Sequence, residues 1–228
     1  MNIFSPKQKV LSGILKTVTL LCALLGTFLS AYAGRNSFMG GRAVFMYFTI
    51  QSNIAIALIC AVGFGKLLRG KAVSDLWYII KFVGTVSITL TGAVFCFVLA
   101  PTFSAGAWNP QNILTHVIVP TAAILDYFVT GISGNIRKRN VFWVILPPIL
   151  YVIYAGIGYV KGWQFAAGYN YPYFFLNWGS PAGAFGFSDE LPYMGCAWWI
   201  LILFCALLLV GYLYLAIVDV LKKRLRHK

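Results

Sequence analysis

The sequence predicts an all-α integral membrane protein, built as one bundle of six transmembrane helices. Hydrophobic residues make up 60% of the 228 residues and charged residues only 10%, whereas a soluble domain carries about 25% charged residues. Six apolar runs reach the roughly 20 residues that a helix needs to cross a bilayer. The alternating pattern of β-barrel strands is absent, and backbone polar groups in lipid then require helices. The whole chain, residues 1–228, is expected to form a single multipass domain.

The predicted spans, in chain order, cover residues 11–33, 44–66, 77–100, 112–132, 141–160 and 195–220. The first span follows basic residues and ends in Ala31-Tyr32-Ala33, a pattern that also occurs in cleavable leader peptides. Its apolar stretch is longer than most leader cores, which favours a retained helix. The fifth span contains Pro147-Pro148, which is expected to kink it.

Only one connection between the predicted spans is long, at residues 161–194. It is rich in aromatic residues and glycine, most densely between Tyr169 and Trp178. Two interpretations fit this composition. The segment lies on the membrane surface as an interfacial aromatic belt, or it dips into the mouth of the bundle.

Lysine and arginine predict the orientation of the bundle, because cytoplasmic loops carry an excess of both. One side of the predicted topology collects most of them, at residues 7–9, 66–71, 137–139 and 222–228. The opposite side has only Arg35, Arg42 and Lys161. Six spans satisfy this bias at every loop. Both termini are therefore expected in the cytoplasm, and the protein in the cell membrane.

The net charge of +13 would suggest nucleic acid as a partner of a soluble protein. Here the basic residues form short clusters between apolar runs, which favours membrane orientation and excludes nucleic acid as the expected partner. The five cysteines are odd in number and form no CxxC pair. This pattern predicts neither a disulfide framework nor a zinc site, and no metal or organic cofactor is expected.

Polar residues within the spans are the candidates for function, because lipid makes them costly. On the second span Thr49, Ser52 and Asn53 share one helical face, although helix packing alone also explains such residues. His116, on the fourth span, shares a face with Asn112, the better candidate to orient its imidazole. By residue count both Thr49 and His116 lie roughly 6–8 Å below the outer boundary. A hydroxyl and an imidazole at one depth are the minimum for base-activated nucleophilic attack.

Asp126 is a further intramembrane charge on the fourth span. It lies about 15 Å deeper than His116 and is rotated by about 80° around the helix, so it is not expected to orient the imidazole. Lys81 on the third span lies at a similar depth. A buried Asp126–Lys81 pair is the preferred interpretation, and a place on an ion pathway is the alternative.

Three short motifs, in this order along the chain, resemble a known family. They are Phe48-Thr49-Ile50-Gln51, then His116 with Val119-Pro120, and then Tyr171-Pro172 with Phe175-Leu176. From about residue 40 onward the chain resembles the androgen-induced and androgen-dependent TFPI-regulating protein family and its bacterial six-pass relatives. The chain departs from the animal pattern at Gln51-Ser52-Asn53 and at Asn177, where the family has an acidic residue.

The resemblance implies a multipass hydrolase that cleaves fatty acid esters of hydroxy fatty acids with a membrane-embedded threonine and a histidine. The family's threonine corresponds to Thr49 and its histidine to His116. These are the two residues that their common depth also selects.

The leading hypothesis is therefore a lipid ester hydrolase with Thr49 as nucleophile and His116 as base. Its expected partners are the lipid bilayer and a lipid ester substrate, and the sequence does not define an oligomeric state. The candidates for stabilising the oxyanion are Ser52, Asn53 and Asn112. Arg42 is the candidate for binding a substrate carboxylate.

Two other classes of protein remain open from the sequence. A small transporter or channel would need a polar path across the membrane, for which Lys81, Thr85, Thr89 and Asp126 are the material. The absence of an inverted repeat or of paired broken helices weighs against it. The other class is a non-catalytic membrane scaffold, whose helices pack through small and hydroxyl residues alone.

Overall fold

A computed structural model of the chain describes residues 5–34, 41–70, 73–131 and 134–226. Within these residues every regular element is a helix, and six helical segments are long and apolar enough to cross a membrane. They cover Pro6–Gly34, Phe48–Arg69, Asp75–Thr102, Pro110–Thr130, Lys138–Val160 and Cys196–Arg224. The predicted all-α class with six spans is confirmed. Residue 132, the end of the predicted fourth span, lies outside the described residues.

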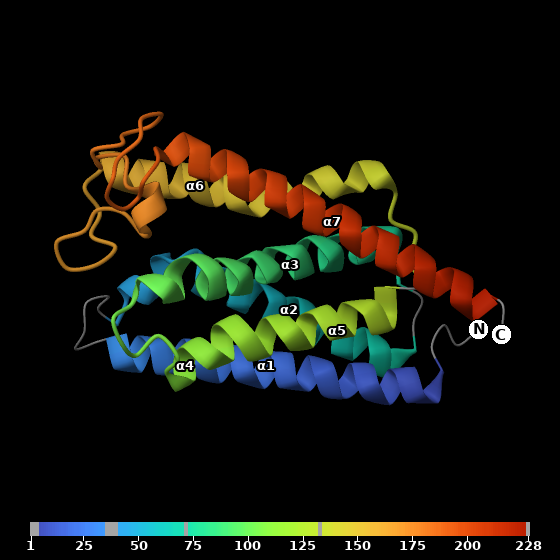
Figure 1. Cartoon of the computed structure of the whole chain (residues 1–228). Helices are drawn as coiled ribbons and strands as arrows, with labels where there is room; N and C mark the ends of the chain where they lie inside the picture. Colours follow the sequence, from blue (N-terminus) through green and yellow to red (C-terminus); the bar gives the residue numbers. More distant parts are fainter. Residues whose placement is uncertain (1–4, 35–40, 71–72, 132–133, 227–228) are drawn as a thin grey trace.

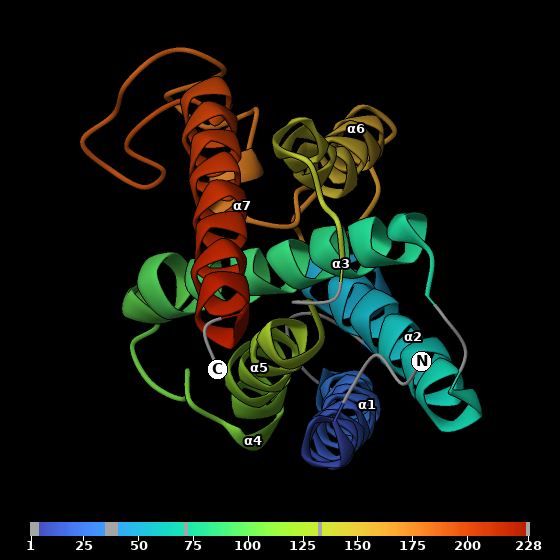
Figure 2. The same ribbon diagram turned by 90° about the vertical axis from the view of Figure 1, so that its right-hand side faces the viewer.

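The helices lie on two sides of α3 (Asp75–Val94). On one side α1 (Pro6–Gly34) packs against α2 (Phe48–Arg69) and α5 (Val119–Gly131), and α2 and α5 both contact α3. On the other side lie α6 (Leu146–Val160) and α7 (Cys196–Arg226) (Figure 2). Because α3 is covered on both sides, half of its span is buried within the protein, against 22% for the peripheral α1.

Local signals in the sequence begin and end several of these helices. The Ser74 hydroxyl accepts the Trp77 N–H at the start of α3, and the Asn109 side chain accepts the Asn112 N–H at the start of α4 (Pro110–Ile113). Both are common N-cap arrangements. Gly70 ends α2 with a φ of 60°, a left-handed conformation that suits glycine.

Two of the spans contain π-helical turns. α3 continues into the π turn η2 (Phe95–Leu99) and the 3-10 turn η3 (Ala100–Thr102), and α4 reaches α5 through the π turn η4 (Leu114–Ile118). In the fifth span the 3-10 helix η5 (Lys138–Ile145) becomes the α-helix α6 at Leu146, directly before Pro147-Pro148. The proline pair therefore marks a change of helix type at the start of α6, where proline is tolerated.

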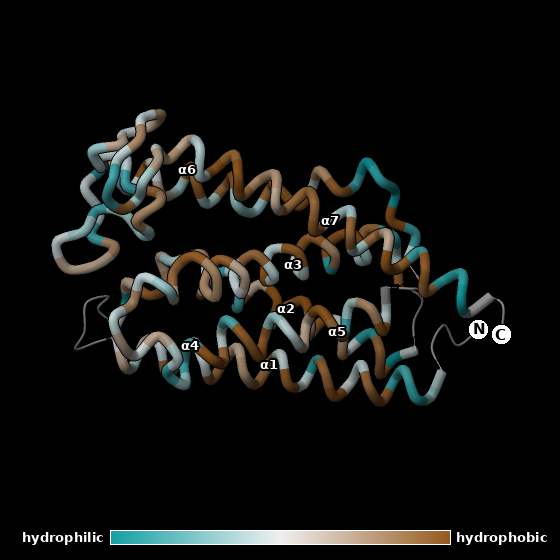
Figure 3. Tube along the Cα trace, viewed as in Figure 1, coloured by the Kyte–Doolittle hydropathy of each residue, from teal (hydrophilic) through white to brown (hydrophobic). Residues whose placement is uncertain are grey.

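The described ends of the chain lie at the same end of the bundle, called here the termini end, and residues 161–194 lie at the opposite, loop end (Figure 1). Hydrophobic residues dominate between the two ends (Figure 3). The predicted basic clusters follow this division, with Lys66, Arg69 and Lys138 at the termini end and Arg42 and Lys161 at the loop end. Of the predicted charges, Arg35, Lys71 and Lys228 lie outside the described residues.

The long connection at the loop end dips into the bundle, which decides between its two interpretations. Phe165, Phe175 and Leu176 are buried in one cluster with Tyr47 and Tyr151. Phe175 and Leu176 belong to the short 3-10 helix η6 (Phe174–Leu176). Tyr47, directly before α2, donates a hydrogen bond from its hydroxyl to the carbonyl oxygen of Phe165 (3.1 Å). The segment thereby covers the start of α2, which carries Thr49.

Candidate active site

Thr49 and His116 meet at the loop end of the bundle. Thr49 is the second residue of α2, and His116 lies in the π turn η4. The Thr49 Oγ1 atom is 3.3 Å from His116 Nε2. Thr49 is half-buried, and His116 is 7% exposed. Two side chains 67 residues apart in the sequence, selected for their common depth, are therefore within hydrogen-bond range.

The imidazole of His116 is held by the π turn and by an aromatic ring. The Phe95 ring, from the π turn η2, stacks on it with centroids 3.9 Å apart and an interplanar angle of 18°. Gly92, one turn before Phe95, permits close approach, since a Cβ atom there would lie 2.7 Å from the His116 carbonyl oxygen. Both rings thus come from π turns, which are rare and often occur at functional sites.

The hydrogen bonds of His116 determine which ring nitrogen carries the proton. Nδ1 lies 3.1 Å from the carbonyl oxygen of Asn112 and 3.0 Å from the Thr115 hydroxyl. The Thr115 hydroxyl donates its own proton to the Gln111 carbonyl (2.8 Å), so it is left as an acceptor toward the ring. With two acceptors beside it, Nδ1 carries the hydrogen, and the lone pair of Nε2 points at Thr49. This tautomer is the one that a general base requires.

Tyr173, from the inserted loop, is the third polar side chain of the site. Its hydroxyl accepts the backbone N–H of Thr49 (3.3 Å) and lies 3.5 Å from Thr49 Oγ1. Burial raises the pKa of the Tyr173 phenol above its ordinary value, so it stays protonated at neutral pH. The first N–H groups of a helix have no partner within the helix. Tyr173 takes one of these N–H groups, that of Thr49, and the proton of its phenol is left to donate to a carbonyl oxygen that becomes negative beside Thr49.

Ser52 and Asn53 lie beside the site, and their side chains bond backbone carbonyls and the Thr91 hydroxyl. The Ser52 hydroxyl bonds the Thr49 carbonyl (3.0 Å) and the Thr91 hydroxyl (2.7 Å). The Asn53 amide donates to the carbonyls of Thr49 (2.8 Å) and Thr115 (3.1 Å). Asn53 therefore ties α2 to the π turn that carries His116. The two residues position the pair, and the prediction that either donates to an oxyanion finds no support in their orientation.

The structure places Asn112 beside the His116 ring and Arg42 on the surface at the same end of the bundle. The Asn112 side chain donates to the Ala107 carbonyl (2.9 Å), away from the pair. It orients His116 as predicted, but through its backbone carbonyl, because the residue precedes the π turn. The Arg42 side chain is exposed at the start of the 3-10 turn η1 (Ala43–Met46). It lies at the same end of the bundle as the site, and the structure gives it no contact with Thr49 or His116.

An apolar cavity adjoins Thr49. Its walls come from α2, α3, α6, α7 and the inserted loop. Aromatic and aliphatic side chains dominate among the lining residues Phe48, Thr49, Leu90, Thr91, Val94, Leu99, Pro148, Tyr151, Val152, Tyr173, Phe175, Leu176, Ile200, Leu203 and Phe204. Thr49 and Tyr173 are thus polar groups at one edge of a hydrophobic space, the composition expected of a site for an apolar ligand.

The predicted Asp126–Lys81 pair is present toward the termini end. Lys81 Nζ lies 2.5 Å from an Asp126 carboxylate oxygen. Lys16 of α1 joins the same carboxylate at 2.6 Å, a partner that the sequence reasoning missed. The signal was available, because Lys16 is a charge within the predicted first span. α1 thus packs on α2 and α5 and contributes a cation to the buried ion pairs of Asp126.

Among the described residues, no three histidine, cysteine, aspartate or glutamate side chains gather as metal ligands would. All five cysteines are free. No protein-family model, curated protein or solved structure matches the chain.

Proposed function

We propose that the protein is a membrane-embedded lipid ester hydrolase in which Thr49 is the nucleophile and His116 the general base. The observation that carries this proposal is the 3.3 Å approach of Thr49 Oγ1 to the His116 nitrogen that bears a lone pair. A threonine hydroxyl is a poor nucleophile until a neighbouring base accepts its proton. A backbone carbonyl on Nδ1 takes the orienting role that a carboxylate has in the Ser-His-Asp triad.

The proposed reaction has two halves. As Thr49 Oγ1 attacks the ester carbonyl carbon, its proton passes to His116 Nε2, and the C=O electron pair moves onto oxygen. The Tyr173 hydroxyl, which accepts the Thr49 N–H, donates its own hydrogen bond to that oxyanion. The ester C–O bond then breaks as His116 protonates the departing alkoxide, which leaves an acyl-Thr49. In the second half His116 takes a proton from water as the hydroxide attacks the acyl carbonyl. The bond between the acyl carbon and Thr49 Oγ1 then breaks, Oγ1 takes the proton from His116, and the carboxylic acid is released.

The cavity beside Thr49 favours an apolar acyl chain as the group transferred. A second hollow, of about 560 Å³, follows the lipid-facing side between α2, α3 and the fifth span, and Phe48 lines both spaces. A lipid ester would reach Thr49 sideways through this hollow. The resemblance to the androgen-induced family suggests fatty acid esters of hydroxy fatty acids. The exposed Arg42 is then the candidate for the free carboxylate.

The proposal places the termini end in the cytoplasm of a cell-membrane protein. The basic residues around that end support this orientation. The active site would then open toward the outer leaflet, with the inserted loop above it as a cover that restricts water.

The test is hydrolysis of a medium-chain lipid ester by the purified protein in detergent, together with labelling by a fluorophosphonate probe. Thr49→Ala should abolish both turnover and labelling, and His116→Ala should abolish turnover. Thr49→Ser should keep a measurable rate, because the hydroxyl is preserved. Thr102→Ala removes an exposed threonine hydroxyl at the same end of the bundle and serves as the control. Turnover by a folded Thr49→Ala protein at the control's rate would remove the threonine from the mechanism.

A further inference from the structure

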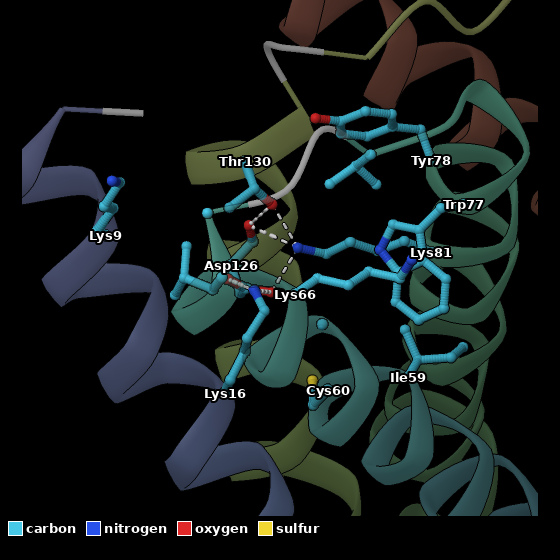
Figure 4. Close-up of a pocket in the computed structure, with 14 residues that line it drawn as sticks. Lys9, Lys16, Ile59, Cys60, Lys66, Trp77, Tyr78, Lys81, Asp126 and Thr130 are labelled. Atoms are coloured by element: carbon cyan, nitrogen blue, oxygen red, sulfur yellow. Dashed lines mark hydrogen bonds and ion pairs between the residues drawn. The ribbon is translucent and has the colours of Figure 1, made fainter. Parts of the chain in front are cut away.

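A cavity at the termini end has an excess of positive charge. It opens between α1, α2, α3 and α5, about 15 Å along the fourth span from His116. Four lysines and one aspartate are the charged residues of its wall, namely Lys9, Lys16, Lys66, Lys81 and Asp126. The formal balance is four positive charges minus one negative charge, or +3. Figure 4 shows the side chains of Lys16 and Lys81 reaching Asp126 from two different helices.

The deepest part of this cavity is an unbalanced charge cluster. Asp126 is fully buried, and Lys16 and Lys81 are each 5% exposed. The carboxylate accepts from Lys16 (2.6 and 2.7 Å), from Lys81 (2.5 Å) and from the Ser12 hydroxyl (2.6 Å). Its hydrogen-bonding capacity is filled, but two ammonium groups share a single negative charge. An uncompensated charge within a membrane span is costly, so a further anion would stabilise the cluster.

Two more lysines extend the positive charge toward the mouth of the cavity. Lys66 is half-buried, with its ammonium 5.1 Å from the centroid of the Trp77 ring. Lys9, on the first turns of α1, is also half-buried. Both side chains line the cavity together with Lys16 and Lys81, so its wall carries four ammonium groups and one carboxylate.

The surrounding residues leave room for this arrangement. A Cβ atom at Gly63 would lie 2.9 Å from the Lys16 side chain, so glycine on α2 lets the Lys16 stem pass. The Thr130 hydroxyl bonds the Lys81 ammonium and turns it toward Asp126. Small and hydroxyl residues from three helices thus fix the two buried ammonium groups at the base of an open cavity.

We propose that this cavity binds a phosphate-type anion, either the headgroup phosphate of an anionic lipid in the leaflet at the termini end or a free phosphate. Lysine binds phosphate as a point charge without requiring bidentate geometry. Basic pockets between transmembrane helices are suited to anionic headgroups. The site is separate from the Thr49–His116 pair, so the proposal does not depend on the hydrolase.

The test uses the full-length protein and variants at the mouth of the cavity, which leave the buried cluster intact. Lys9→Gln with Lys66→Gln removes two lining charges from α1 and α2. Lys7→Gln with Arg69→Gln removes two exposed charges from the same helices, outside the cavity, and is the matched control. Inorganic phosphate binding is titrated in a neutral detergent at fixed ionic strength. Lipid retention is measured by native mass spectrometry after extraction from bilayers of equal parts phosphatidylglycerol and phosphatidylcholine.

We expect the wild-type protein to bind at least one of the two probes, and the lining variant to weaken that binding at least tenfold. The control should change it less than twofold. Retention of phosphatidylglycerol that phosphate does not displace identifies a lipid headgroup, whereas saturable phosphate binding identifies a free anion. Failure of the wild-type protein to bind either probe overturns the proposal. So does an equal loss in the two variants, because the effect would then be one of net charge alone.

Discussion

The two ends of the bundle accommodate polar groups by different means. At the loop end the polar groups of the candidate site are neutral, and backbone carbonyls or hydroxyls satisfy them: Asn112 and Thr115 bond the ring of His116, and Asn53 bonds the Thr49 carbonyl. Toward the termini end the groups are charged, and they compensate one another around Asp126. The neutral arrangement leaves a lone pair and a hydroxyl available for chemistry. In the charged arrangement all the hydrogen bonds are filled and a net charge remains.

The largest effect is expected from removing the reactive pair at the loop end. Thr49→Ala and His116→Ala should each lower kcat by about 1,000-fold or more, because nucleophile and base act as one unit. For the same reason the double variant should be no slower than the slower single variant. Ester hydrolysis by the three purified proteins measures this. Losses that multiply in the double variant would show that the two residues act independently.

The next largest effect is expected at Asp126, where substitution should lower the free energy of unfolding. This tests whether the termini end depends on compensated charges. Asp126→Ala leaves two buried ammonium groups without their carboxylate, a change that costs about 3–5 kcal/mol. Replacing Lys16 and Lys81 by Met together with Asp126→Leu removes all three charges and should recover most of this loss. Thermal unfolding in detergent, followed by size-exclusion chromatography, compares the variants. An Asp126→Ala protein as stable as the wild type would refute a charged cluster.

A smaller effect is expected from Tyr173, the donor that the inserted loop contributes. Tyr173→Phe removes a single oxyanion donor and should lower kcat by about 10- to 100-fold, below the loss for a principal donor. Tyr171→Phe, two residues earlier in the same loop, is the control. The raised pKa of Tyr173 keeps the phenol neutral, so its donor should not be lost with rising pH below about 10. A pH–rate profile of the wild type checks this.

The smallest effect is expected from the close approach at Gly92. Gly92→Ala places a methyl group against the His116 carbonyl, and such overpacking costs about 1–3 kcal/mol. The shift of the π turn should lower turnover by a few-fold. Gly65→Ala on α2 meets open space and should leave both stability and turnover near wild type, or slightly raise stability. Equal behaviour of the two variants would contradict the constraint on His116.

The candidate site could be predicted only in part from the sequence. Residue counts along the spans selected Thr49 and His116, because depth in a membrane helix follows from position at about 1.5 Å per residue. Helical periodicity did not reveal that Ser52 and Asn53 turn to backbone carbonyls, since a shared face does not fix the partner of each side chain. Tyr173 was missed because its place depends on how a loop without regular periodicity folds between the helices.

The sequence alone determined the class of the fold and its six spans, because the energetic cost of backbone polar groups in lipid allows only helices over such apolar runs. It also favoured a cationic partner for Asp126 over a place on an ion pathway, since an isolated charge in a span is costly. Tertiary structure decided which cations reach that carboxylate and how Thr49 faces His116. It also decided which ring nitrogen of His116 carries the lone pair that faces Thr49. These outcomes depend on the packing of helices distant in sequence and on π turns that alter the helical register, and local sequence encodes neither.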